Sequence, residues 1–254
     1  MVKIFIDPGH GGSDPGAVGN GLKEKDLTLT ISKKILSLLS NYDVSIKLSR
    51  TGDTYPSLSE RAKMANDWGA DYFVSIHINS GGGTGFESYV YTSVNSATVA
   101  YQNVIHAEII KAIGGVKDRG KKRANYAVLR ETNMPAILTE NLFIDNANDA
   151  KKLRQDSFLN QVAQGHVTGL VKAIGLRQKL QPTQKKIYFY TGGYRGSALV
   201  KVHDFISNNG WWFVPERLND GSIAFLVGEF TPGTEKANTM ENFLKENGFW
   251  YEVR

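Results

Sequence analysis

The sequence contains no cysteine. It can therefore form no disulfide, thiolate metal site or cysteine nucleophile, and any bound metal must use histidine and carboxylate ligands. No stretch approaches the roughly 20 consecutive apolar residues that a membrane-spanning helix needs, so we expect no membrane insertion. The N-terminal apolar run ends at Asp7, too early for the core of an export signal. We therefore expect synthesis in the cytoplasm without a signal peptide.

A strong block of one charge is also missing. The formal net charge of +5 is spread along the 254 residues. We therefore expect no nucleic-acid partner, although a mildly basic protein is attracted to anionic polymers such as cell wall. Nothing in the sequence defines the oligomeric state, and a monomer is our expectation.

Strand-length apolar runs alternate with segments of helical spacing as far as residue 176. This alternation predicts an α/β domain over 1–176, with a mostly parallel sheet flanked by helices. Ser57 and Glu60 form a capping box at the start of one helix. The expected strands are 2–6, 44–48, 72–77, 86–91, 126–129 and 136–140, and the expected helices are 24–39, 57–68, 99–113, 149–153 and 157–174.

The polar stretch 177–185 lacks apolar periodicity and is predicted to be a linker. Beyond it, two halves of the remaining chain resemble each other: 187–194 is similar to 223–230, and Phe205 corresponds to Phe243. Each half has a strand, helix, strand pattern. We therefore predict a small α+β domain of β-α-β-β-α-β order over 186–254.

Three metal-ligand candidates fall at or near the ends of these predicted elements. His10 follows the first strand in a glycine-rich turn, Glu24 opens the first helix and His77 ends a buried strand. The carboxyl ends of strands in α/β sheets are where ligands gather, and two imidazoles with one carboxylate are typical of catalytic zinc. Individually, these residues could also be a turn histidine, a helix N-terminal acid and a core histidine.

Glu140 closes another apolar strand and is the candidate proton carrier. Among the other histidines, His166 lies on the apolar face of its helix and is predicted to pack in the core. His106 and His203 are expected to be partly exposed. Arg50 and Arg61 are expected to pair with carboxylates, and Glu87 either lines a groove or lies on a solvated strand face.

Five separated stretches resemble one known family, in sequence order: residues 7–12 (DPGHGG), Glu24, 48–51 (LSRT), 75–80 (SIHINS) and 139–144 (TENLFI). They are similar to the zinc-dependent N-acetylmuramoyl-L-alanine amidases, including sporulation-associated and phage lytic members. The resemblance implies a zinc exopeptidase-like fold over the first domain. It also implies that His10, Glu24 and His77 hold Zn²⁺ and that Glu140 is catalytic.

By this resemblance, the substrate is peptidoglycan. The reaction would cleave the amide between the lactyl group of N-acetylmuramic acid and L-alanine of the stem peptide. Zinc would bind the lactyl oxygen, and Glu140 would activate water and then protonate the alanine nitrogen. Glycine-rich loops at 11–21 and 81–85 would leave an open groove, and the enzyme would act on the wall after release by mother-cell or phage lysis.

The tail resembles the peptidoglycan-binding repeats known as SPOR domains, through 225–230 (FLVGEF) and 247–249 (NGF). Peptidoglycan is therefore also its expected ligand. Stacking faces for sugars would come from aromatic residues, namely Tyr188, Tyr190, Trp211, Trp212, Trp250 and Tyr251. A zinc carboxypeptidase or aminopeptidase, and a catalytically inactive peptidoglycan-binding protein, are the alternatives for the whole chain.

Overall fold

A computed structural model describes residues 1–179 and 186–254. The chain divides into two compact units, Met1–Lys179 and Leu180–Arg254. Residues 177–179, expected in the linker, pair with the first unit, since the amide of Lys179 donates to the Asn41 carbonyl at 2.7 Å. The remainder of the predicted linker lies outside the described residues. Within the described ranges, no helix is both long enough and apolar enough to cross a bilayer.

The first unit contains a six-stranded sheet in the order β4-β1-β5-β8-β6-β7. The four strands β4, β1, β5 and β8 are mutually parallel, whereas β6 runs antiparallel to β8 and parallel to β7. The prediction of a mostly parallel sheet is therefore confirmed. The strands are β1 (Val2–Pro8), β4 (Val44–Leu48), β5 (Tyr72–Asn79), β6 (Phe86–Val90), β7 (Asp118–Arg123) and β8 (Ala136–Phe143).

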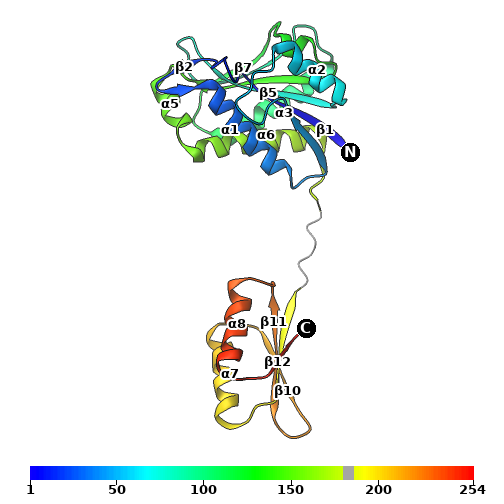
Figure 1. The fold of residues 1–254 in the computed structure, drawn as a ribbon, viewed down its shortest axis with the longest axis vertical. Helices are drawn as coiled ribbons and strands as arrows, with labels where there is room; N and C mark the ends of the chain where they lie inside the picture. Colours follow the sequence, from blue (N-terminus) through cyan, green and yellow to red (C-terminus); the bar gives the residue numbers. More distant parts are fainter. Residues whose placement is uncertain (180–185) are drawn as a thin grey trace. The chain divides into compact units, whose positions relative to one another are not determined.

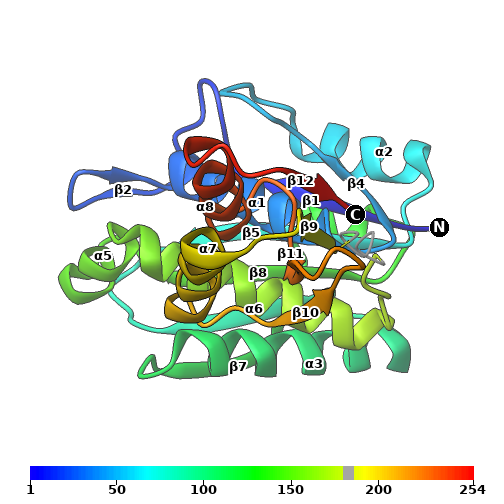
Figure 2. The same ribbon diagram turned by 90° about the horizontal axis from the view of Figure 1, so that it is seen from below.

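Helices cover both faces of this sheet because its strands are apolar on both sides (Figure 1). The larger core joins one face to α1 (Glu24–Leu39), α3 (Ser96–Ile113) and α6 (Asp156–Ile174). A smaller core joins the other face to α2 (Leu58–Trp68) and α4 (Ala127–Arg130). The short hairpin of β2 (Val18–Gly19) and β3 (Leu22–Lys23) extends at one end (Figure 2), and α5 (Ala147–Leu153) follows β8.

One predicted strand is wrong, and one strand of the six-stranded sheet was not predicted. Residues 126–129 were expected to form a strand, but Tyr126 is the N-cap of the one-turn helix α4, whose Val128 and Leu129 are buried in the smaller core. Four residues are too few to separate helical from strand periodicity. Strand β7 was not expected, because its sequence DRGKKR has no apolar alternation and it pairs through its backbone at the sheet edge.

The predicted helix ends agree with the structure at two places. Ser57 and Glu60 form the reciprocal capping box at the start of α2. Gly175 closes α6 in the left-handed conformation, with φ of 71°. These local signals depend only on neighbouring residues, which is why they can be read without knowledge of the fold.

His166 is fully buried on α6, as expected of a core histidine. Its Nδ1 donates to the Val162 carbonyl at 2.8 Å, and its Nε2 accepts from the Thr139 hydroxyl at 2.9 Å. Burial lowers the pKa of His166 to about 4 and outweighs the hydrogen bond to Val162, which acts in the opposite direction. The folded protein therefore holds this histidine neutral.

We predict that His166 makes the protein less stable in acid. In the unfolded chain, this histidine takes up a proton near pH 6.5. The free energy of unfolding is therefore unaffected above that pH and falls by up to about 3 kcal/mol as the pH drops toward 4. Chemical denaturation of His166→Leu across this range should show a flatter pH dependence than the wild type. His203→Leu, which removes an exposed histidine, is the control, and an equally steep decline in His166→Leu would contradict the prediction.

The second unit has the predicted element order. It comprises β9 (Ile187–Thr191), α7 (Gly196–Asn208), β10 (Phe213–Arg217), β11 (Ile223–Phe230), α8 (Glu235–Glu246) and β12 (Tyr251–Val253). The strands pair antiparallel in the order β10-β11-β9-β12. The repeat-related Phe205 and Phe243 stack with ring centroids 3.6 Å apart, so the two halves meet at their equivalent residues.

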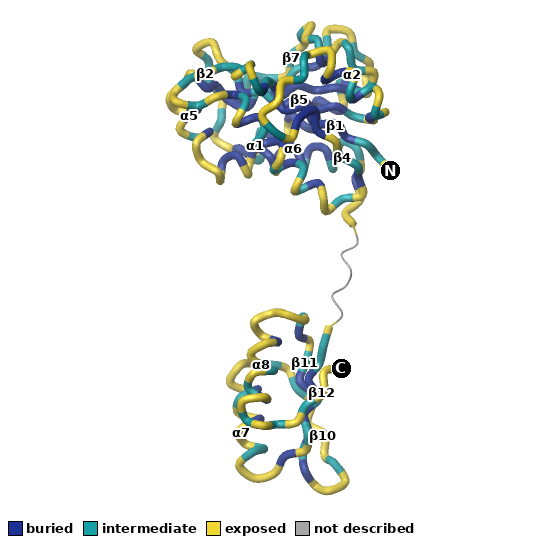
Figure 3. Tube along the Cα trace, in the orientation of Figure 1, coloured by how far each residue is buried: buried dark blue, intermediate teal, exposed yellow. Residues whose placement is uncertain are grey.

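The two helices of this unit pack on the same face of the sheet, where the buried residues lie (Figure 3). Trp211 and Tyr251 are partly buried and pack against this core, near Phe230 and Phe189 respectively. On the other face, a Cβ at Gly228 would lie 2.2 Å from Tyr188 and 3.2 Å from Trp212, so both rings pack over this glycine. Of the aromatic residues expected to stack on sugars, Trp211 and Tyr251 therefore contact the core on the helix side of the sheet.

Candidate active site

The loop after β1 is fixed by two buried arginines. Arg61 donates from Nη1 to the Pro8 carbonyl at 2.6 Å and from Nη2 to the His10 carbonyl at 2.7 Å. Arg50 donates from Nη2 to the intervening Gly9 carbonyl at 2.9 Å. His10 has a φ of 61°, a conformation that costs energy for a side chain other than glycine. The two guanidinium groups hold the histidine in this conformation.

Only one of these arginines is paired with a carboxylate as expected. Arg61 Nη1 lies 2.8 Å from Asp7 Oδ1, and both side chains are buried. Burial opposes ionisation of Asp7, but Arg61 together with the hydroxyl groups of Ser49 and Ser75 outweighs it and lowers the pKa of the carboxyl. The hydrogen bonds of Arg50 instead go to backbone carbonyls and to the Thr28 hydroxyl.

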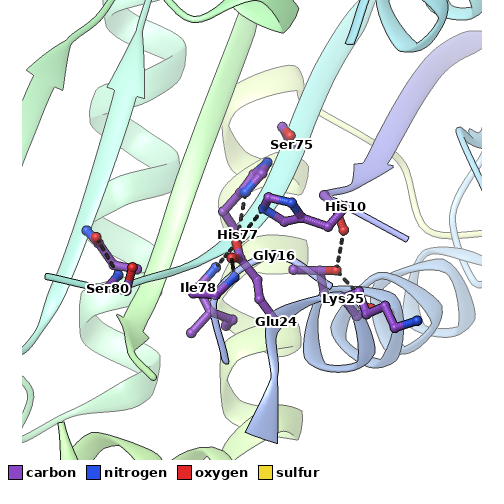
Figure 4. A network of polar contacts seen from close by, with 12 residues as sticks. His10, Gly16, Glu24, Lys25, Ser75, His77, Ile78 and Ser80 are labelled. Atoms are coloured by element: carbon purple, nitrogen blue, oxygen red, sulfur yellow. Dashed lines mark hydrogen bonds and ion pairs between the residues drawn. The ribbon is translucent and has the colours of Figure 1, made fainter. Parts of the chain in front are cut away.

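Side chains from three separate elements converge beside this loop (Figure 4). Glu24 Oε1, from the first residue of α1, lies 3.2 Å from His10 Nε2 and 2.9 Å from His77 Nδ1. One ligand atom from each of these residues lies within 4.8 Å of the others. The structure thus brings together the three residues that the sequence suggested as metal ligands.

Two glycines leave the space in which these three side chains fit. A Cβ at Gly9 would lie 2.4 Å from His77 Cε1. At Gly16, whose φ is 64°, a Cβ would lie 2.7 Å from Glu24 Oε2 and from His10 Cδ2. Such distances are too short for any other residue type, so both glycines are needed for the close approach of the three donors.

Asp14 orients His10, and the sequence reasoning did not find it. Its Oδ2 lies 2.8 Å from His10 Nδ1, which leaves His10 Nε2 directed at Glu24. A carboxylate on the outer nitrogen of a metal-binding histidine is typical, because it fixes the tautomer and the ring orientation. No signal in the sequence identified it, because a spacing of four residues within a glycine-rich loop does not specify a contact.

Electrostatics within the cluster favour ionised Glu24. Burial opposes its charge, but hydrogen bonds from His10 and His77 hold the pKa of Glu24 well below its ordinary range. Burial likewise opposes the charged form of His10, yet Glu24 and Asp14 raise its pKa. The amides of Ala17 and Ile78 also donate to the Glu24 carboxylate, at 2.9 and 3.0 Å. The imidazoles of His10 and His77 and the carboxylate of Glu24 together fit a divalent cation such as Zn²⁺.

Glu140 lies beside the cluster on β8, directly opposite His77 in the parallel register. Its Oε2 is buried and has no hydrogen-bond partner among residues 1–179 and 186–254. Burial raises the pKa of Glu140 well above its ordinary value, and the carboxylates of Glu24 and Glu87 raise it further. A carboxyl group whose pKa is raised in this way is suited to exchange a proton with a reacting group.

Glu87 is the antiparallel partner of Glu140 on β6 and is buried, with 2% of its surface exposed. It therefore does not lie on a solvated strand face. Burial opposes its ionisation, but Lys122, Tyr89 and Arg119 lower the pKa of Glu87 to about 2.

The expectation for His106 was also wrong: this residue is buried, and it contacts Ser88 and Asp118 because β7 covers that region. The side chain of His203 is partly exposed, as expected.

A histidine-carboxylate-histidine cluster beside an unpartnered carboxyl group, at the carboxyl ends of parallel strands, is typical of a metal-dependent hydrolase. The family model for N-acetylmuramoyl-L-alanine amidase matches residues 4–172, which lie in the first unit. The chain belongs to this family.

Relatives and solved structures agree with this assignment. The chain is 59% identical over 180 residues to the sporulation-specific N-acetylmuramoyl-L-alanine amidase of Bacillus subtilis (strain 168), covering 70% of each chain. It is 52% identical over 182 residues to the endolysin of Bacillus phage SPP1, covering 69% of this chain and 67% of the phage protein. The catalytic domain of the amidase CwlV from Bacillus (Paenibacillus) polymyxa superimposes with a TM-score of 0.66 at 37% identity, over 70% of this chain and all of that domain (100%).

Proposed function

We propose that this chain carries out the family's reaction, hydrolysis of the N-acetylmuramoyl-L-alanine amide of peptidoglycan, with Zn²⁺ held by His10, Glu24 and His77. The convergence of these three donors beside Glu140 is the observation that carries the proposal. A zinc ion there would polarise the scissile carbonyl and lower the pKa of its water toward about 7. Asp14 would keep His10 Nε2 directed at the ion.

Glu140 would act as the proton carrier. Its buried Oε2 has no hydrogen bond within the described residues that would have to break before it accepts a proton. It would take a proton from the attacking water and deliver it to the alanine nitrogen as the amide bond breaks. The raised pKa that burial gives Glu140 favours holding that proton between the two transfers.

Identification of the products tests the proposal. Mass spectrometry of digested peptidoglycan should reveal glycan with free lactyl carboxylates and peptides with N-terminal alanine, and both should be missing after chelation of the metal. Release of single amino acids from peptide ends would instead indicate a zinc exopeptidase. Unchanged peptidoglycan would indicate an inactive binding protein.

We further propose that residues 1–176 are the catalytic domain and that residues 186–254 form a SPOR-like domain that binds peptidoglycan. The proposal is supported by the sheet face opposite the two helices, where Tyr188 and Trp212 pack over Gly228 and 56% of Trp212 is exposed. Arg254 lies 3.8 Å from the ring centroid of Tyr190 on the neighbouring strand. Exposed aromatic rings at the surface of a sheet suit the apolar faces of sugars.

Trp212→Ala is expected to weaken sedimentation of the full chain with purified cell walls about tenfold, or ~1.4 kcal/mol, because a stacking surface is lost. Turnover of a small soluble muropeptide should not change. Val200→Ala, which truncates an exposed side chain on α7, is the matched control. Equal sedimentation of both variants and the wild type would argue against wall binding by this face.

A further inference from the structure

Arg119, on the edge strand β7, has most of its hydrogen-bonding capacity unused. Its Nε donates to Glu87 Oε2 at 2.7 Å, and its guanidinium carbon lies 4.8 Å from the centroid of the Phe143 ring. In the described part of the chain, Nη1 and Nη2 have no hydrogen-bond acceptor. The side chain is 27% exposed, so these donors are accessible to a ligand. The hydrogen bond from Nε to Glu87 and the contact between the flat guanidinium and the Phe143 ring therefore fix the position of this group.

Glu87 is the residue that holds this arrangement. One of its carboxylate oxygens accepts from Asn79 and Tyr89, both at 2.7 Å, and the other accepts from Arg119 and Lys122. The side chain of Lys122 is also partly exposed, at 36%. One buried carboxylate thus orients two cations, and the charge of the group as a whole remains positive.

These cations lie in line with the candidate active site. Across the sheet, His77 on β5 is paired with Glu140 on β8, and Glu140 is paired with Glu87 on β6. Strand β7 is the next neighbour of β6. Because adjacent strands are about 4.8 Å apart, β7 lies roughly 10 Å from β8. An extended peptide rises about 3.4 Å per residue, so this span corresponds to roughly three residues.

We propose that Arg119, assisted by Lys122, binds a carboxylate of the stem peptide on the far side of the scissile amide from the sugar. This inference rests on the proposed function, because it places the amide at Glu140. The Nη1 and Nη2 groups of a planar guanidinium can donate two parallel hydrogen bonds to the two oxygens of a carboxylate. The surrounding strand, with four basic residues and one acidic residue over 118–123, attracts an acidic peptide as well. The site thus selects acidic stems and fixes the direction of the peptide across the sheet.

Two synthetic substrates test this assignment. Both are N-acetylmuramoyl-L-alanyl peptides, and the acidic residues after the alanine carry carboxylates in one and carboxamides in the other. Arg119→Gln should lower kcat/KM for the carboxylate substrate about 10- to 100-fold, mainly through KM, and leave kcat/KM for the carboxamide substrate within about twofold of the wild type. Calorimetry with the free acidic peptide should show the same loss of affinity.

Arg123→Gln is the matched control, since it removes the same charge from the same strand, where Arg123 Nη1 donates to the Thr92 carbonyl. Arg119→Lys tests the geometry and should recover only part of the carboxylate preference. Equal losses on both substrates, or an equal effect of Arg123→Gln, would overturn the assignment. Failure of the wild type to cleave either substrate would instead overturn the proposed function, and the calorimetric comparison would still test peptide binding by Arg119.

Discussion

Glu140→Gln is expected to lower kcat for muropeptide hydrolysis by about 10²- to 10⁴-fold, the usual contribution of general acid-base catalysis. Glutamine has nearly the same size as glutamate but cannot take up and return a proton at this position. Zinc binding should be unchanged, because Glu140 is not among the three converging candidate ligands. The measurement is single-turnover kinetics on a soluble muropeptide, together with metal analysis of the same sample.

Glu131→Gln provides the control for this variant. Glu131 lies at the end of α4 and pairs with Arg130 at 2.8 Å, away from the ligand cluster. Its substitution should leave the rate essentially unchanged. If Glu140→Gln kept more than roughly a tenth of the wild-type rate with zinc bound, another group would have to carry the proton.

Glu24→Gln is expected to remove zinc from the protein and activity with it. Removing a group that hydrogen-bonds to a metal-binding histidine typically lowers metal affinity 10- to 100-fold. We expect about that loss for Asp14→Asn, because Asp14 contacts His10. Glu24 would contact the ion directly, so its loss should exceed that range. Competition with a chromophoric chelator measures both affinities without reference to catalysis.

Excess zinc should restore the activity of Asp14→Asn well before that of Glu24→Gln. Asp26→Asn is the control, because Asp26 is an exposed acid in the same first turn of α1. Should Glu24→Gln bind one zinc ion with wild-type affinity, Glu24 would serve only the helix terminus. That role was the alternative that the sequence left open.

Much of the fold follows from the sequence because its signals are local or strongly periodic. The buried strands β1, β5 and β8 are apolar runs, and the capping box at Ser57 needs only residues within one turn. Strand β7 was missed because an edge strand can be polar and still pair through its backbone. Its absence from the prediction also led to the wrong environment for His106, which contacts Asp118 of that strand.

The site was predictable in part for a related reason. His10, Glu24 and His77 follow recognisable element boundaries, and the order of the motifs resembles a known family. Asp14 and Glu87 could not be assigned, because their roles depend on what lies beside them after folding. The role of Asp14 depends on its contact with the ring of His10. The role of Glu87 depends on contacts with Arg119 and Lys122, which lie 32 and 35 positions later in the chain. Neither relation has a signature in residue spacing.

The two arginines that hold the carbonyls of Pro8, Gly9 and His10 would affect how a metal ion is acquired. A loop fixed in this way has lost its conformational entropy during folding, before any ion arrives. Zinc would then bind to a preorganised set of donors, and its affinity would not be reduced by the cost of ordering the chain. The apoprotein should therefore fold cooperatively without metal, in contrast to small domains whose folding waits for zinc.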